Sequence, residues 1–212
     1  MNAITRQIPN TLTLIRLILT VVYLWLFWRG IESTKSQQVE ATITHHQIYL
    51  LTWSFWLFII AAVTDFLDGY LARSWQCTSK FGRILDPLVD KLLISGGFVL
   101  FAIIGESITG IAWWMVVVIL AREIFVTIAR SILEAKGREF GAAMSGKIKM
   151  TIQCFAIGFI IASLGFYHDQ AWCSFIATVL IWLAIISTII SGIIYIPALR
   201  DNNAKIKSDE AA

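Results

Sequence analysis

The chain has 212 residues, of which 58% are hydrophobic and only 15% are charged, and its formal net charge at pH 7 is +3. Soluble domains carry about 25% charged residues, so this composition excludes a disordered chain or a coiled coil and argues against a cytosolic globule. The small net charge gives no indication of nucleic-acid binding. The sequence therefore predicts an integral membrane protein, with residues 1–212 forming one domain.

The apolar segments predict an all-α fold with six transmembrane helices. A helix needs about 20 mostly apolar residues to cross the hydrocarbon core of a bilayer. Six segments come close to that length: 12–28, 48–64, 85–104, 111–131, 148–166 and 171–197. The connection 30–46 is rich in Ser, Thr, Gln and His and is expected to be a passive loop, whereas the connection 65–83 is charged and contains glycine.

The distribution of Lys and Arg predicts the orientation of these helices. With six spans, 15 of the 17 basic residues fall on the side of both termini, and only Arg29 and Lys35 fall on the other side. The positive-inside rule then places the N-terminal segment 1–10 and the C-terminal tail 199–212 in the cytoplasm. All three histidines lie on the outer face, so a histidine-based catalytic or metal site is not expected. The three cysteines lack metal-ligand spacing and are interpreted as buried small residues.

Four aspartates form two pairs at the predicted cytoplasmic edge. Asp65 and Asp68 are three residues apart, and Asp86 and Asp90 are four apart, so each pair lies on one face of its helix. Two antiparallel helices would bring the four carboxylates together in a polar cavity that faces the cytoplasm. Their mutual repulsion requires a counter-charge. Divalent cations supply one, and we expect two Mg²⁺ ions, with Mn²⁺ as the alternative.

The residues between the two pairs carry a resemblance to a known family. They read Asp65-x-x-Asp68-Gly69-x-x-Ala72-Arg73, then eight residues, then Gly82-x-x-x-Asp86-x-x-x-Asp90. This pattern resembles the signature of the CDP-alcohol phosphotransferase family, with every specified position filled at the family's spacing. The resemblance implies a six-helix membrane enzyme that displaces CMP from a CDP-linked lipid with an alcohol acceptor.

The same resemblance implies a role for each matching residue. The four aspartates match the metal-site carboxylates, and Asp90 also matches the general base. The positions that match the binding site for cytidine and pyrophosphate are Asp68, Gly69, Ala72, Arg73 and Gly82. Asn10 and Thr13, with Arg16, are spaced three apart along one helix face and are expected to meet the nucleotide site. The alternative interpretation makes Asn10 a helix cap and Arg16 an anchor that reaches the membrane surface.

Basic residues near the predicted membrane entry points favour an anionic acceptor. Arg122 and Lys147 lie where a charge is costly unless it has a partner, and a phosphate on the acceptor would supply one. Arg16 completes this predicted phosphate-binding set. The N-terminal Ile8-Pro9-Asn10, with its later Thr and Arg, and the segments 121–124 and 146–151 resemble bacterial phosphatidylglycerophosphate synthases.

That resemblance implies transfer of the phosphatidyl group from CDP-diacylglycerol to sn-glycerol 3-phosphate, which gives phosphatidylglycerophosphate and CMP. It also implies a homodimer in the bacterial cytoplasmic membrane. The signature itself leaves other acceptors open, namely inositol phosphate, serine and phosphatidylglycerol. A divalent-cation transporter and a non-catalytic lipid-binding protein are the alternatives from other classes. An ion path is disfavoured because the outer halves of the helices are rich in Trp, Phe, Leu and Ile.

Overall fold

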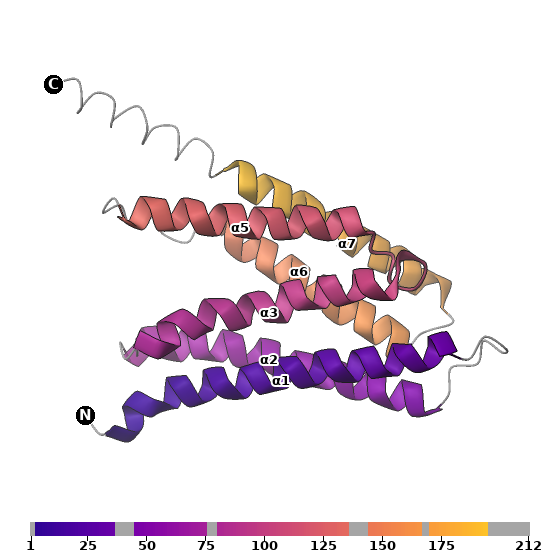
Figure 1. Ribbon diagram of the computed structural model, residues 1–212, viewed down its shortest axis with the longest axis horizontal. Helices are drawn as coiled ribbons and strands as arrows, with labels where there is room; N and C mark the ends of the chain where they lie inside the picture. The colour runs from indigo at the N-terminus through magenta and orange to yellow at the C-terminus, as the bar shows by residue number, and fades with distance from the viewer. Residues whose placement is uncertain (1–2, 37–44, 76–79, 136–143, 167–169, 195–212) are drawn as a thin grey trace.

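The computed structural model contains seven helices within the residues that it describes, which are 3–36, 45–75, 80–135, 144–166 and 170–194 (Figure 1). Their bounds are α1 Ala3–Ser36, α2 His45–Trp75, α3 Lys80–Ile104, α4 Glu106–Thr109, α5 Trp113–Ala135, α6 Met144–Phe166 and α7 Ala171–Ile193. Side chains are described for 11–32, 45–65, 88–132, 146–166, 170 and 172–194. The expectation of an all-helical chain is confirmed for this part of the sequence.

Within the residues whose side chains are described, four of these helices contain stretches long and apolar enough to cross a membrane. The stretches are Thr11–Glu32 in α1, His45–Asp65 in α2, Gly146–Phe166 in α6 and Trp172–Ile193 in α7. They correspond to four of the six predicted spans. The other two predicted spans fall on α3 and α5, and the second of these helices carries Arg122, Glu123 and Arg130 within its length.

The helices extend further than hydrophobicity alone predicts. Part of the expected loop 30–46 is helical, since α1 continues to Ser36 and α2 begins at His45. Most of the expected connection 65–83 is also helical, because α2 continues to Trp75 and α3 begins at Lys80. Asp86 therefore lies inside α3, six residues after its first residue. The remaining residues of these connections, 37–44 and 76–79, lie outside the described part of the chain, as does the tail 199–212.

A tight reversal joins α3 to α5. It contains the single turn α4, flanked by Gly105 and Gly110. The backbone φ angles of these two residues are 120° and 71°, values that glycine adopts without the steric cost of a Cβ. Thr109 closes the reversal because its hydroxyl donates to the carbonyl oxygens of Phe101 and Gly105.

The long helices run side by side as a bundle, alternating in direction (Figure 1). The first turns of α1, α3 and α6 and the last turns of α2, α5 and α7 gather at one end of this bundle. Helix α1 packs along α2 and α3, α6 packs between α2 and α7, and α5 contacts α3 and α7. Helix α3 is thus in contact with helices from both halves of the chain.

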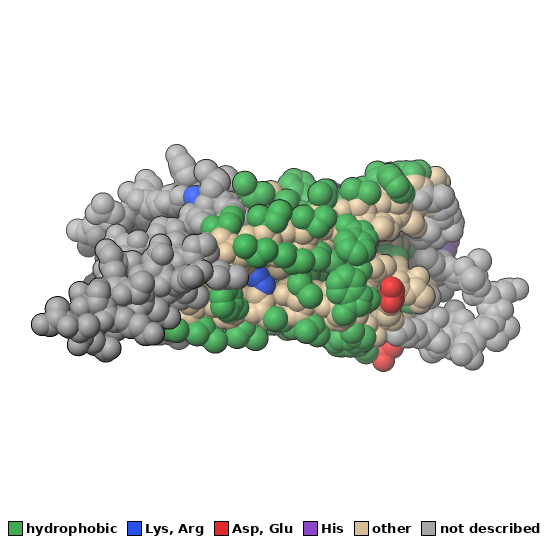
Figure 2. All heavy atoms as spheres, turned by 90° about the horizontal axis from the view of Figure 1, so that it is seen from above, with side chains coloured by type: hydrophobic (Ala, Val, Ile, Leu, Met, Phe, Trp, Pro, Cys, Tyr) green, Lys and Arg blue, Asp and Glu red, His purple; other side chains and the backbone are tan. Residues whose placement is uncertain are grey.

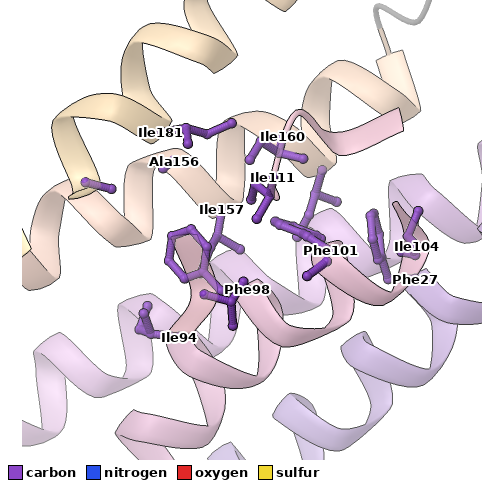
Figure 3. Close-up of a cluster of buried hydrophobic side chains, with 14 of the residues drawn as sticks. Phe27, Ile94, Phe98, Phe101, Ile104, Ile111, Ala156, Ile157, Ile160 and Ile181 are labelled. Carbon is purple, nitrogen blue, oxygen red and sulfur yellow. The ribbon is translucent and has the colours of Figure 1, made fainter. Parts of the chain in front are cut away.

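Aliphatic and aromatic side chains fill the centre of the bundle. Phe98 and Phe101 of α3 pack near Ile157 of α6 and Ile111, which precedes α5 (Figure 3). Large apolar side chains also cover the outside (Figure 2), and Phe155 and Phe175 are 68% and 72% exposed. A surface of this kind suits contact with lipid chains, because hydrocarbon does not penalise exposed apolar groups as water does.

Small residues allow α6 to approach α2 closely. A Cβ added at Gly165 would lie 3.4 Å from the Leu51 Cβ and 3.5 Å from backbone atoms of Leu51 and Thr52. Close backbone approach through small residues is a common basis of helix packing in membranes. Gly146, on the same helix, has no atom within 4 Å of such a Cβ among the described residues.

We predict that Gly165→Leu destabilises the bundle by about 1–3 kcal/mol, because the added side chain meets backbone that cannot move aside. Thermal unfolding of the purified protein in detergent measures the effect. Gly146→Leu is the matched control. It makes the same chemical change on α6, at a position where no described atom lies within 4 Å of the added Cβ. Equal melting temperatures for the two variants would contradict this account of the α2–α6 contact.

Candidate active site

A buried guanidinium joins three helices at the centre of the candidate site. Arg16 of α1 is 2% exposed, and its Nη1 donates hydrogen bonds to Asp65 Oδ1 of α2 at 2.5 Å and to Asp90 Oδ1 of α3 at 2.6 Å. The two carboxylates are 24% and 32% exposed. Charge-assisted bonds of this length are among the strong hydrogen bonds of proteins. Two of the four predicted metal-site aspartates therefore lie together, and each is partly open to solvent.

Helix direction explains how residues 25 positions apart meet here. Asp65 lies ten residues before the end of α2, and Asp90 lies ten residues after the first residue of α3. Because these helices are antiparallel, equal distances from the connection place the two aspartates at the same level (Figure 1). At 1.5 Å per residue, that level is roughly 15 Å from the connecting ends.

Several other predicted site residues are placed only by their backbone. Asp68, Gly69, Ala72 and Arg73 belong to α2, Gly82 and Asp86 belong to α3, and Asn10 belongs to α1. Their side chains lie outside the described residues. Thr13 is described: it is buried, at 3% exposure, one helical turn before Arg16 on α1.

The donor set of the described aspartates fits a divalent cation. Asp65 Oδ1 and Asp90 Oδ1 bond the same nitrogen, so they lie within about 5 Å of each other. Mg²⁺ prefers oxygen ligands, and carboxylates are among them. Among the described side chains, no group of three or more His, Cys, Asp and Glu residues gathers. The two aspartates that would enlarge this pair, Asp68 and Asp86, are not among those side chains.

A second charged cluster lies between α5 and α6. Glu123 accepts hydrogen bonds from Arg122 Nη1 at 3.1 Å and from the Lys149 ammonium. Lys149 is buried at 5% exposure. Lys91 of α3 lies near the cluster, since its Nζ lies 2.6 Å from Oγ1 of Thr127, one turn after Glu123. Two cations thus contact one carboxylate and a third lies near it, which leaves an excess of positive charge.

Arg122 retains donor capacity within this cluster. Its Nε is buried and has no hydrogen-bond partner among the residues that the structure describes. The aliphatic part of the side chain packs against α7 at Gly192. A Cβ added to this glycine would lie 3.2 Å from Arg122 Cγ. A buried guanidinium with a spare N–H suits an anionic ligand, because leaving a buried donor unpaired is costly.

The structure separates two lysines that the sequence presents together. Lys147 and Lys149 are two residues apart on α6 and therefore point to opposite sides of the helix. Lys147, which the sequence assigns to the acceptor phosphate, is exposed, whereas Lys149 faces Glu123. Sequence reasoning did not assign Lys149 or Glu123 to the site. The spacing of positions 149, 153, 156 and 160 places them on one face of a helix, and this face of α6 is buried. Helical periodicity could therefore have indicated that Lys149 points inward.

Comparisons with known proteins show the family to which the sequence is similar. The family model described as CDP-alcohol phosphatidyltransferase matches residues 6–190. The chain is 34% identical to a Mycobacterium tuberculosis (H37Rv) protein named probable phosphatidylglycerophosphate synthase, over 92% of this chain and 83% of the relative. Two proteins named CDP-diacylglycerol–glycerol-3-phosphate 3-phosphatidyltransferase are also similar. The Bacillus subtilis (strain 168) protein is 33% identical over 88% of this chain and 91% of its own length, and the Escherichia coli (K12) protein is 30% identical over 92% and 95%.

The matched region contains the residues of the Arg16–Asp65–Asp90 contact and those of the Glu123 cluster. It also contains the complete aspartate signature from Asp65 to Asp90. The chain therefore belongs to the CDP-alcohol phosphatidyltransferase family.

Proposed function

We propose that this protein transfers the phosphatidyl group of CDP-diacylglycerol to sn-glycerol 3-phosphate and releases phosphatidylglycerophosphate and CMP. One observation carries the proposal: consecutive residues of α3 serve two different clusters. Asp90 contacts Arg16 beside Asp65, and Lys91 bonds to Thr127 beside the Arg122–Glu123–Lys149 cluster. The residue proposed as the proton acceptor is thus adjacent in sequence to one that lies beside the proposed phosphate-binding cluster. The names of the relatives from Mycobacterium, Bacillus and Escherichia support the same reaction.

The proposal includes a site for two divalent cations, formed by Asp65, Asp68, Asp86 and Asp90. Membership of the family and the oxygen donor set of Asp65 and Asp90 support this site. When bound, such ions would neutralise negative charge on the pyrophosphate and on the departing CMP. Mg²⁺ is the expected ion, and Mn²⁺ has the same preference for carboxylate oxygen.

In the proposed reaction, Asp90 accepts the proton of the 1-hydroxyl of glycerol 3-phosphate. The hydroxyl oxygen forms a bond to the phosphorus that carries the diacylglycerol, and the bond from that phosphorus to the bridging oxygen breaks, so this oxygen leaves with CMP. A carboxylate is a weak base for a hydroxyl, and positioning must supply much of the rate. The CDP-lipid would be bound by residues of α1, α2 and α3: Asn10, Thr13, Asp68, Gly69, Ala72, Arg73 and Gly82.

The acceptor phosphate would be held at the second cluster. Arg122 offers its unpartnered Nε–H, and Lys149 and Lys91 add positive charge near it. Arg and Lys bind phosphate through charge-assisted hydrogen bonds. Lys147, on the opposite side of α6, is expected to contribute less than Arg122.

The proposed topology has six transmembrane helices, with α3 and α5 added to the four apolar stretches. Helices of 25 and 23 residues have rises of roughly 37 and 34 Å, enough to cross a hydrocarbon core of about 30 Å. The first turn of α1 and the last turn of α7 lie at one end of the bundle, which supports termini on the same side, the cytoplasmic one by the positive-inside rule (Figure 1). The family resemblance also suggests a homodimer in a bacterial inner membrane.

CMP release by the purified protein tests the proposed reaction. With CDP-diacylglycerol and Mg²⁺, we expect CMP to form only when glycerol 3-phosphate is added, and we expect EDTA to abolish its release. Labelled inositol phosphate, serine and phosphatidylglycerol, each offered alone, are the control acceptors. Faster turnover with any of these would replace the proposed acceptor, and absence of CMP release with all four would overturn the transferase activity.

Replacing the proposed base removes its charge with little change of shape. We predict that Asp90→Asn lowers kcat by about 10²–10⁴-fold, the usual contribution of general base catalysis. Turnover with saturating substrates and Mg²⁺ is the measurement. Glu106→Gln is the matched control, because Glu106 is exposed at the opposite end of α3 from the connection to α2. Near-normal turnover of Asp90→Asn would show that Asp90 is not the general base.

The proposed acceptor site is tested by comparing Arg122 and Lys147, the two basic residues that the sequence places near membrane entry points. We predict that Arg122→Gln raises KM for glycerol 3-phosphate by roughly 10- to 100-fold, because a charged hydrogen bond to phosphate is lost. The KM for CDP-diacylglycerol should stay unchanged. Lys147→Gln is measured alongside it and should have a smaller effect. Equal effects of both variants would contradict the assignment of the phosphate to the Arg122–Lys149 side of α6.

A further inference from the structure

The position of Arg16 Nη1 has a consequence for cation binding, if the metal site of the proposed function exists. This nitrogen lies 2.5 Å from Asp65 Oδ1 and 2.6 Å from Asp90 Oδ1 and bonds to both oxygens. Mg²⁺ prefers carboxylate oxygens as ligands. A cation that takes these two oxygens as ligands would therefore compete with the guanidinium for them.

The guanidinium has a clear physical role without an ion. Two carboxylates this close repel each other, and partial burial increases the cost of keeping both ionised. A positive charge that donates to both offsets that repulsion. Arg16 is itself almost fully buried, so it also depends on these carboxylates, because an unpaired buried charge is strongly destabilising.

We propose that Arg16 is an internal counter-ion that stabilises Asp65 and Asp90 when no cation is bound and gives up its hydrogen bonds to them when a divalent cation binds. Part of the binding energy of the cation is then used to break the bonds of Arg16. The cation affinity is consequently lower than the carboxylates alone would give. Arg16 acts here as a positioning residue, through its contacts with the two aspartates.

Cation binding without substrates tests this role on the full-length protein in nanodiscs. Mn²⁺ is titrated, and free Mn²⁺ is followed by its electron paramagnetic resonance signal. We expect Arg16→Met to bind Mn²⁺ more tightly, on the order of tenfold, since the two charged hydrogen bonds of Arg16 no longer have to be broken. Arg29→Met is the matched control. It makes the same change on α1, at an exposed residue that pairs with Glu32 at 3.8 Å, and should bind Mn²⁺ as the wild type does.

Thermal unfolding supplies a second readout. In EDTA, Arg16→Met should melt at a lower temperature than the wild type, and saturating Mg²⁺ should raise its melting temperature by more. If the variant folds only with a cation present, it is purified in Mg²⁺ throughout. Arg16→Lys, which keeps the charge, is then compared with it and should show an intermediate affinity for Mn²⁺.

The outcomes separate this inference from the function on which it rests. Unchanged or weaker Mn²⁺ binding by Arg16→Met, with normal binding by the wild type, overturns the counter-ion role and leaves the metal site standing. A merely structural role of Arg16 would weaken binding and so falls under the same outcome. Absence of Mn²⁺ binding by the wild type, or binding unaffected by Asp65→Asn and Asp90→Asn, overturns the metal site and the inference together.

Discussion

The contact of one guanidinium with two carboxylates determines how the first half of the chain is arranged. Arg16 lies inside the apolar stretch Thr11–Glu32 of α1, and a charge in such a place is expensive unless it is paired. Its two partners come from α2 and α3, so the three helices must meet at one level. Tyr23 reinforces the same arrangement two turns further along, because its hydroxyl donates to the Leu93 carbonyl of α3 and Ser54 of α2 bonds to its backbone oxygen.

Helix α3 connects this arrangement to the second half of the chain. Neighbouring residues on a helix point about 100° apart, so Asp90 and Lys91 cannot face the same partner. One faces α1 and α2, and the other reaches Thr127 of α5. The apolar side chains of α3, from Val89 to Ala102, fill the bundle below both contacts and fix the rotation of the helix. The rigid packing of α3 thus sets the spacing between the carboxylates and the basic cluster.

The sequence predicts where the candidate site lies along the helices better than it predicts which side chains contact one another there. Helical spacing and antiparallel helices suffice to bring Asp65 and Asp90 to one level. Counting apolar residues does not find the end of α2 at Trp75 or the start of α3 at Lys80, because the motif residues there are polar yet helical. The sequence also does not predict the two carboxylates that Arg16 contacts, those of Asp65 and Asp90. A charge on an apolar helix fits a membrane anchor, a phosphate ligand or an ion pair equally well, and only tertiary contacts distinguish them.

The level of the carboxylates along the bundle matters for a lipid substrate. In the sequence, the apolar run 48–64 ends directly before Asp65, while the helix continues for ten residues beyond Asp65 to Trp75. Asp65 therefore lies at the boundary between the part of the bundle that suits hydrocarbon and the part that suits headgroups and water. A lipid whose acyl chains lie along the exposed apolar side chains would hold its phosphates at this boundary. A soluble acceptor would approach the same boundary from water. We infer that, in the proposed reaction, the lipid reaches Asp90 from the bilayer and the acceptor reaches it from water.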